Sequence, residues 1–228
     1  MTSVAVAENL VTRQSYVRQT LASTWANLPL VLLSGILFSL TALLGWHLAI
    51  SGIPIAAALL AVLLIVPAWS ALLAQQAEIA RDVRTGIHTM LVAFPRFWLR
   101  STALALIACF QVAVALLTWP LVLAPEASPI VLIGFAADLF GLALLAAVSL
   151  YAFPLIVVYN ASVRTALRNA LILASRHIAN TLGLLGMGIL CLLGIRSVSP
   201  VLLLVLPPIW GMFLVNNCRM VVEEEIGV

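Results

Sequence analysis

The chain has 228 residues, of which 64% are hydrophobic and 8% are charged, and its formal net charge is +3. A soluble domain is about 45–50% apolar and about 25% charged, so this composition excludes an ordinary soluble protein and indicates a protein of the lipid bilayer. All 11 basic residues are arginines. They are spread along short connecting segments rather than gathered into one patch, which argues against nucleic-acid binding.

Six apolar runs are typical of membrane-spanning helices, which need about 20 mostly apolar residues. They cover residues 27–47, 53–75, 101–123, 129–158, 180–195 and 200–217. This pattern predicts an all-α fold, a polytopic bundle of six transmembrane helices. Residues 1–26 are expected to form a tail and an interfacial helix, residues 27–217 the transmembrane domain, and residues 218–228 a C-terminal tail.

Three polar segments have the apolar periodicity of helices that lie on a membrane surface, namely residues 10–25, 87–100 and 162–177. In the second segment, Ile87, Leu91, Phe94 and Trp98 are expected to lie on one side of the helix. In the third segment, Ser162 has the chemistry of an N-cap. Such helices either rest on anionic lipid or dock a soluble partner. The candidate lipid- or partner-docking residues are Arg164, Arg168 and Arg176 of the third segment, together with Arg81 and Arg84 in the polar run after the second apolar run.

The arginines also predict the orientation of the chain. With the N-terminus inside, ten arginines face the cytoplasm and only Arg196 lies outside. The ten are Arg13, Arg18, Arg81, Arg84, Arg96, Arg100, Arg164, Arg168, Arg176 and Arg219. Because cytoplasmic loops are enriched in basic residues, we expect both termini in the cytoplasm, which agrees with an even number of spans.

Three polar residues form a candidate intramembrane site. Asp138 is the one acidic residue well inside a span, and Gln111 lies at a similar depth on the preceding span. Arg196 stands at the outer end of the fifth span. An ionisable group in a bilayer is costly and usually faces a protein interior or a wet cavity. Asp138 is therefore either a carboxylate that binds substrate or a proton, or part of a structural hydrogen-bonded clasp.

No enzyme motif stands out in the sequence. It contains no HExxH, no GxSxG, no glycine-rich phosphate loop and no pair of intramembrane carboxylates. The three histidines, His47, His88 and His177, are scattered, and the three cysteines lack metal-ligand spacing. We therefore expect no catalytic residue, no metal site and no cofactor, and we predict that the protein is not an enzyme.

Residues 151–178 contain FP-x4-Y followed by RTALRNALILASRH, and residues 93–100 read AFPRFWLR. In these motifs the chain resembles the YesL-like family of bacterial integral membrane proteins, whose function is unknown. The resemblance implies a multi-pass protein of the bacterial plasma membrane that is associated with carbohydrate-uptake genes. It supplies no catalytic residues.

Three functions remain open. The first is an accessory or regulatory component associated with solute uptake, for which the link to sugars depends on the resemblance. The second is the permease subunit of an ATP-driven transporter, with residues 162–177 or 76–86 as the coupling element. The third is a structural or lipid-organising protein. The expected partners are membrane lipid and either an ATP-binding transport subunit or a second copy of the chain.

Overall fold

The structure is a computed structural model that describes residues 16–81, 85–124 and 128–226. Every regular element in these ranges is a helix. Six helical segments are long and apolar enough to cross a membrane. They are Leu28–Ile50, Pro54–Ile79, Ile87–Val122, Pro129–Tyr159, Ile178–Ser197 and Pro200–Glu225. The predictions of an all-α chain and of six long apolar helices are therefore confirmed.

A helix of residues 16–26 precedes α2. The elements that follow are α2 (Leu28–Ile50), α3 (Pro54–Leu60), the π-helical turn η1 (Ala61–Ile65), α4 (Val66–Ile79), α5 (Ile87–Val122), α6 (Pro129–Tyr159), α7 (Val163–Arg176), α8 (Ile178–Ser197), the 3₁₀ turn η2 (Pro200–Leu204) and α9 (Leu206–Ile226). The end of the molecule where α4 and α6 finish and α5 begins carries several arginines, and we call it the arginine-rich end.

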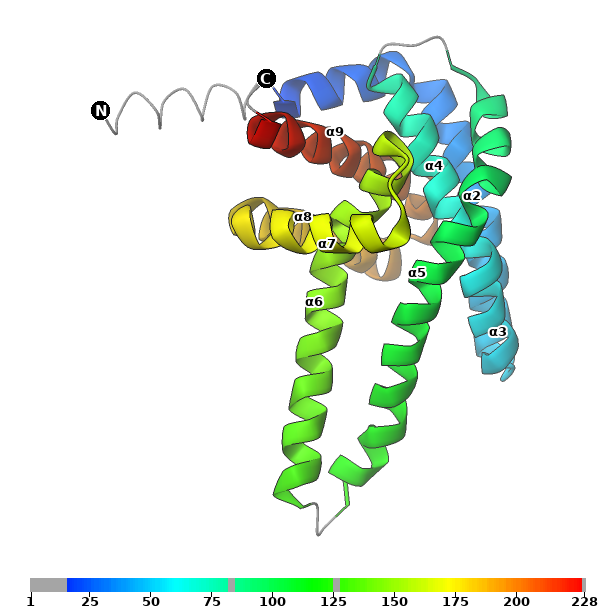
Figure 1. Cartoon of the computed structure of the whole chain (residues 1–228). Coiled ribbons are helices and arrows are strands. Elements are labelled where there is room, and N and C mark those ends of the chain that lie inside the picture. The colour runs from blue at the N-terminus through cyan, green and yellow to red at the C-terminus, as the bar shows by residue number, and fades with distance from the viewer. Residues whose placement is uncertain (1–15, 82–84, 125–127, 227–228) are drawn as a thin grey trace.

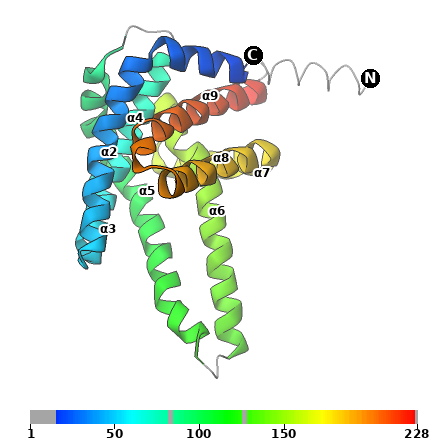
Figure 2. The ribbon, with the colours of Figure 1, turned by 180° about the vertical axis from the view of Figure 1, so that it is seen from behind.

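The helices run in two directions (Figures 1 and 2). In both views α2, α3–α4, α5 and α6 run lengthwise, and the hairpin of α5 and α6 extends far beyond the other elements. In the same views α7, α8 and α9 lie across this direction, near the arginine-rich end. The six apolar helices are thus present, but they are not arranged as six parallel spans.

The core gathers around α4, which packs on α5 through small side chains. Ser101 of α5 donates a hydrogen bond to Ser70 of α4 over 2.7 Å, and both residues are fully buried. Ala74 and Ala77 on α4 and Ala93 on α5 are also buried. Small residues at facing positions let helix backbones approach closely, which is how helices associate where the hydrophobic effect offers little.

Pro67 explains the π-helical turn and its contacts with α5. A proline has no N–H to donate to the helix, so one carbonyl in the preceding turn loses its partner. Trp98 of α5 donates its indole N–H to the Leu63 carbonyl over 2.8 Å, and Thr102 approaches the Val62 carbonyl at 3.5 Å. The carbonyls that Pro67 leaves without an intrahelical donor are thus satisfied from the neighbouring helix, as a protein in lipid requires.

The Pro207–Pro208 pair has the same effect on η2. An α-helical bond from residues 207 and 208 would end on the carbonyls of Leu203 and Leu204. Ser39 of α2 donates its hydroxyl to the Leu203 carbonyl over 2.8 Å. The Leu204 carbonyl instead lies against Gly35 of α2, where a Cβ would stand 1.8 Å from its oxygen. The absence of a side chain at Gly35 is therefore what lets η2 approach α2.

The segment predicted as a separate interfacial helix, residues 87–100, is the first part of the continuous helix α5. Pro95 lies inside this helix and does not end it. Of the residues predicted to share one side, Ile87 and Phe94 pack against the core, whereas Leu91 is 60% exposed. The fully buried residues of this part of α5 are Met90, Ala93 and Phe97. The small Ala93 and the nearby Ser101 fit against α4, and this packing decides the orientation more strongly than the periodicity of the larger residues.

The two C-terminal helices are joined by aromatic and polar contacts. Trp210 of α9 packs over Gly188 of α8, where a Cβ would lie 2.8 Å from the indole, and it donates its N–H to the Leu184 carbonyl. The fully buried Tyr151 of α6 contacts Thr181 of α8 and accepts from Asn217 of α9. Helix α9 continues to Ile226, through most of the predicted C-terminal tail.

Candidate functional site

Gln111 and Asp138 face each other across the α5–α6 hairpin. The Nε2 atom of Gln111 donates to the Oδ1 atom of Asp138 and lies 3.4 Å from the Asp138 backbone carbonyl. Asp138 is 7% exposed, although most residues around it on α6 are exposed. The structure therefore brings together two of the three residues predicted for the intramembrane site.

The sequence of α6 makes room for this contact one turn beyond Asp138. A Cβ at Gly141 would lie 3.0 Å from Nε2 of Gln111, so a larger residue would press on the amide. In contrast, a Cβ added at Gly134 would meet no atom within 4 Å. Of the small residues on this side of α6, Gly141 is thus the glycine that admits the Gln111 side chain.

The second carboxylate oxygen of Asp138, Oδ2, is buried and has no hydrogen-bond partner among the described residues. A buried carboxylate needs a proton, a donor or a cation to offset its lost hydration. Chemically, the pair can hold the two helices together through Oδ1, and it leaves Oδ2 without a hydrogen-bond partner among the described residues.

Arg196 does not join this pair. It is exposed at the end of α8, and no hydrogen bond or ion pair links it to Asp138 in the described part of the chain.

Helix α7 presents two of the predicted docking arginines. Ser162 caps the helix by accepting from the Thr165 N–H, as the sequence predicts. Ala166, Ala170, Leu173 and Ala174 are buried, whereas Arg164 and Arg168 are exposed. Neither arginine has a hydrogen bond or an ion pair within the described residues. Helix α7 therefore packs on the rest of the protein through its small residues, and its basic side is exposed.

Arg176 has a different environment from the other two arginines of α7. It contacts Glu225 of α9 at 2.5 Å, and His177 lies 3.5 Å from the same carboxylate. This exposed ion pair is worth little stability but ties the end of α7 to α9. Arg84 lies outside the described residues, so its position cannot be compared with the prediction.

Arg81 belongs to a cavity between α4, α5 and the end of α6. The cavity has a volume of about 320 Å³, and Arg96, His88, Thr89 and Asn160 also line it. The sequence analysis predicted His88 to be isolated and counted Arg96 only for the orientation of the chain. The packing of α5 on α4 brings these residues together, which their spacing in the sequence does not indicate.

Asn160 is fixed in this cavity by its backbone and by Arg100. Its φ of 53° lies in the left-handed region, which asparagine tolerates at helix ends. The Nη1 atom of Arg100 donates to the Asn160 carbonyl over 3.0 Å and to Oδ1 over 2.7 Å, and it approaches the Ala161 carbonyl. A basic side chain at the C-terminal end of α6 also suits the helix dipole.

No group of three or more His, Cys, Asp or Glu residues that could hold a metal occurs in residues 16–81, 85–124 and 128–226. Comparison of the chain with protein-family models, with curated proteins and with solved structures found no match. The resemblance to the YesL-like family therefore stays a prediction. The fold defines the chain at a coarser level, as a helical protein with six helices of membrane-spanning length.

Proposed function

We propose that the protein is an accessory or regulatory component of a solute-uptake system in the bacterial plasma membrane and that it is not an enzyme. Both termini lie in the cytoplasm in this proposal, so that the arginine-rich end faces inward. Six helices of membrane-spanning length support a multi-pass protein. The association with uptake, and with sugars in particular, derives from the sequence resemblance.

The observation that carries the proposal is the exposed basic side of α7. Arg164 and Arg168 stand one turn apart on a helix whose other side is buried. A helix fixed by its neighbours loses little conformational entropy on binding, which favours a docking role. Two open guanidinium groups suit an acidic surface on a cytoplasmic partner.

A second candidate is the permease subunit of an ATP-driven transporter, and the form of α7 favours it. This short helix begins directly after the end of α6 with a capping serine, and it offers an exposed side to a soluble partner. In this candidate α7 is the coupling element. The two candidates differ in whether substrate flux requires the protein.

The test starts with gentle purification from the native membrane and mass spectrometry of bound proteins and lipids. The double variant Arg164→Glu and Arg168→Glu is compared with the wild type and with Arg196→Glu, which changes an exposed arginine away from α7. We expect a partner that remains with the wild type and with Arg196→Glu but is lost from the double variant. Retention of lipid alone, or of further copies of the chain alone, contradicts partner docking.

Uptake in a deletion strain then separates the two candidates. An accessory component leaves residual flux, and the double variant should resemble the deletion. A stoichiometric ATP-binding subunit together with complete loss of flux in the deletion strain favours the permease candidate. A normal rate of uptake in the deletion strain and in the strain with the double variant contradicts both candidates.

A further inference from the structure

The cavity beside Arg81 lies near the arginine-rich end and has apolar residues in its wall. Its wall includes Ala74 and Ala77 of α4, Ala93 and Phe97 of α5, and Val157 of α6. Its polar side chains come from the ends of the same three helices. At about 320 Å³ the cavity falls within the range of small-ligand sites, which combine apolar walls with a few polar groups.

The cavity has more positive than negative charge, because two arginines line it against one glutamate. The Glu78 carboxylate already accepts hydrogen bonds from the Thr85 and Thr89 hydroxyls, at 3.0 and 2.9 Å. Its charge is thus partly satisfied by neutral donors. The net positive charge that remains in the cavity favours the binding of an anion.

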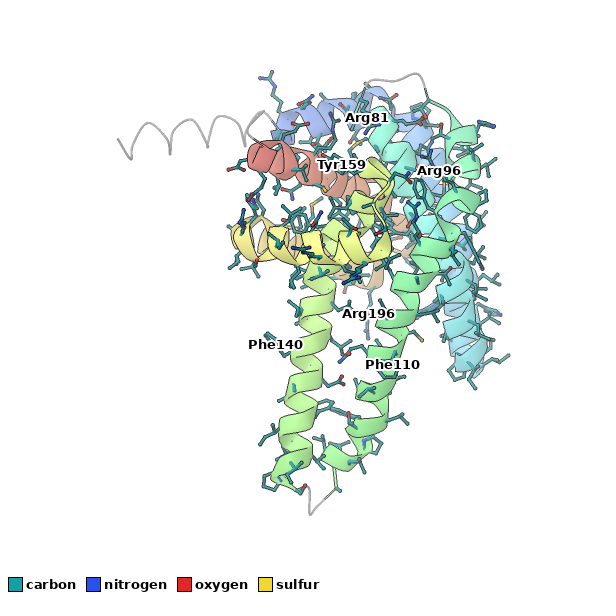
Figure 3. The ribbon with its side chains drawn as sticks, in the orientation of Figure 1. Arg81, Arg96, Phe110, Phe140, Tyr159 and Arg196 are labelled. Carbon is teal, nitrogen blue, oxygen red and sulfur yellow. The ribbon has the colours of Figure 1, made fainter. Side chains whose placement is uncertain are left out.

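Among the described residues, the two arginines keep donors that no other residue accepts. Within the described residues, Arg81 makes one long hydrogen bond, to the Val158 carbonyl at 3.4 Å. The Arg96 guanidinium lies 5.2 Å from the Phe97 ring centroid and has no hydrogen bond or ion pair in the same part of the chain. Arg100, by contrast, is committed to the end of α6. Figure 3 shows Arg81 and Arg96 at the same end of the molecule.

We infer that this cavity binds the phosphate headgroup of an anionic phospholipid, with Arg81 and Arg96 as its phosphate ligands. Guanidinium groups bind phosphate oxygens in a fork, which accounts for arginines in this position. The adjoining surface of α5 exposes Leu91 and Leu99, which are 60% and 73% exposed and suit the acyl region of the same lipid. The chain has six helices of membrane-spanning length. A protein that lies in a bilayer is surrounded by phospholipid, so the proposed ligand is within reach of the cavity.

The test uses the purified full chain in detergent after its native lipids have been removed. Short-chain phosphatidylglycerol, phosphatidylcholine and inorganic phosphate are titrated separately, and binding is followed by native mass spectrometry and by the shift in melting temperature. Arg96→Gln removes one phosphate ligand, while Arg18→Gln removes an exposed arginine from the helix of residues 16–26. Melting without lipid checks that each variant is folded.

We expect phosphatidylglycerol to bind and phosphatidylcholine to bind more weakly. Arg96→Gln should lower the affinity for phosphatidylglycerol by about tenfold or more, as the loss of charge-assisted hydrogen bonds implies. Arg18→Gln should leave it unchanged. Equal losses in both variants, or no loss in Arg96→Gln, overturn the inference. Binding of inorganic phosphate as tight as that of the lipid also overturns it, because the ligand is then a free anion.

Discussion

Gln111 donates a hydrogen bond from its amide to the Asp138 carboxylate, and this contact joins α5 and α6 where their hairpin extends beyond the other helices (Figure 1). Few other polar contacts are made in this part of the hairpin. Trp119 and Phe135 supply an aromatic contact between the same helices, with ring centroids 5.6 Å apart. The pair therefore fixes the register of the hairpin even if Asp138 has a further role.

Gln111→Leu should destabilise the protein, because it leaves the Asp138 carboxylate buried without a donor. The expected loss is about 1–3 kcal/mol, the usual cost of an unsatisfied buried polar group. Replacing both residues by leucine should cost less than Gln111→Leu alone, because no buried polar group is then left unpaired. Melting of the purified variants in detergent measures both effects.

Asp138→Asn distinguishes the structural role from the functional one. It keeps an oxygen that accepts from Gln111 but removes the titratable group. If the pair is only a clasp, the variant retains its melting temperature, and cells that carry it behave like the wild type in the uptake assay proposed above. Lost activity in a protein that melts like the wild type would identify Asp138 as a functional carboxylate.

Gly35→Ala should weaken the packing of η2 on α2. A Cβ at this position meets the Leu204 carbonyl oxygen at 1.8 Å, so the two elements must separate. Overpacking of this kind costs about 1–3 kcal/mol. Gly186→Ala is the matched control, because its Cβ would meet nothing within 4 Å and alanine favours a helix by up to about 1 kcal/mol. Equal melting temperatures for the two variants would show that the close approach at Gly35 is not needed.

The effect of Trp98→Phe on stability should depend on whether residue 67 is a proline. The substitution removes the indole donor from the Leu63 carbonyl, at an expected cost of about 0.5–1.5 kcal/mol. In a Pro67→Ala background residue 67 has its own N–H, so the same substitution should cost less. A double-mutant cycle on melting free energies measures this difference directly. An additive result would mean that Trp98 contributes only apolar contact.

The sequence was most informative where hydrophobicity alone decides the structure. Length and apolar content located all six long helices, and the Ser162 cap located the start of α7. The Gln111–Asp138 contact was also predictable, because similar depths on antiparallel neighbours bring two residues together. These features depend on local pattern and on adjacency in the chain.

The sequence did not predict the features that depend on the choice of neighbouring helices. The buried side of α5 follows from small residues that meet α4, and the cavity beside Arg96 follows from that packing. Likewise, the role of Gly35 is visible only once η2 lies against α2. The placement of α8 and α9 across the hairpin also could not be read from their hydropathy, because length and apolar content do not specify direction.

The number of membrane crossings is testable at Arg196. Six crossings place residue 196 outside the cell, whereas four crossings, by α2, α3–α4, α5 and α6, leave it inside. Either number keeps the two termini on the same side. Helix α8 exposes apolar residues such as Leu182, Ile189 and Leu190, and it lacks the charged side that a surface helix needs. We therefore expect α8 to cross the bilayer, which places residue 196 outside the cell.

The experiment uses a chain in which Cys109, Cys191 and Cys218 are replaced by alanine. Arg196→Cys is then labelled in intact cells with a maleimide that cannot cross the membrane. Ser51→Cys, in the exposed turn after α2, is the outside control, and Ser175→Cys, on the exposed side of α7, is the inside control. We expect residue 196 to be labelled together with residue 51. Labelling of residue 196 only after the cells are opened would establish four crossings and would make all the arginines cytoplasmic, because the one exception to the charge bias would be removed.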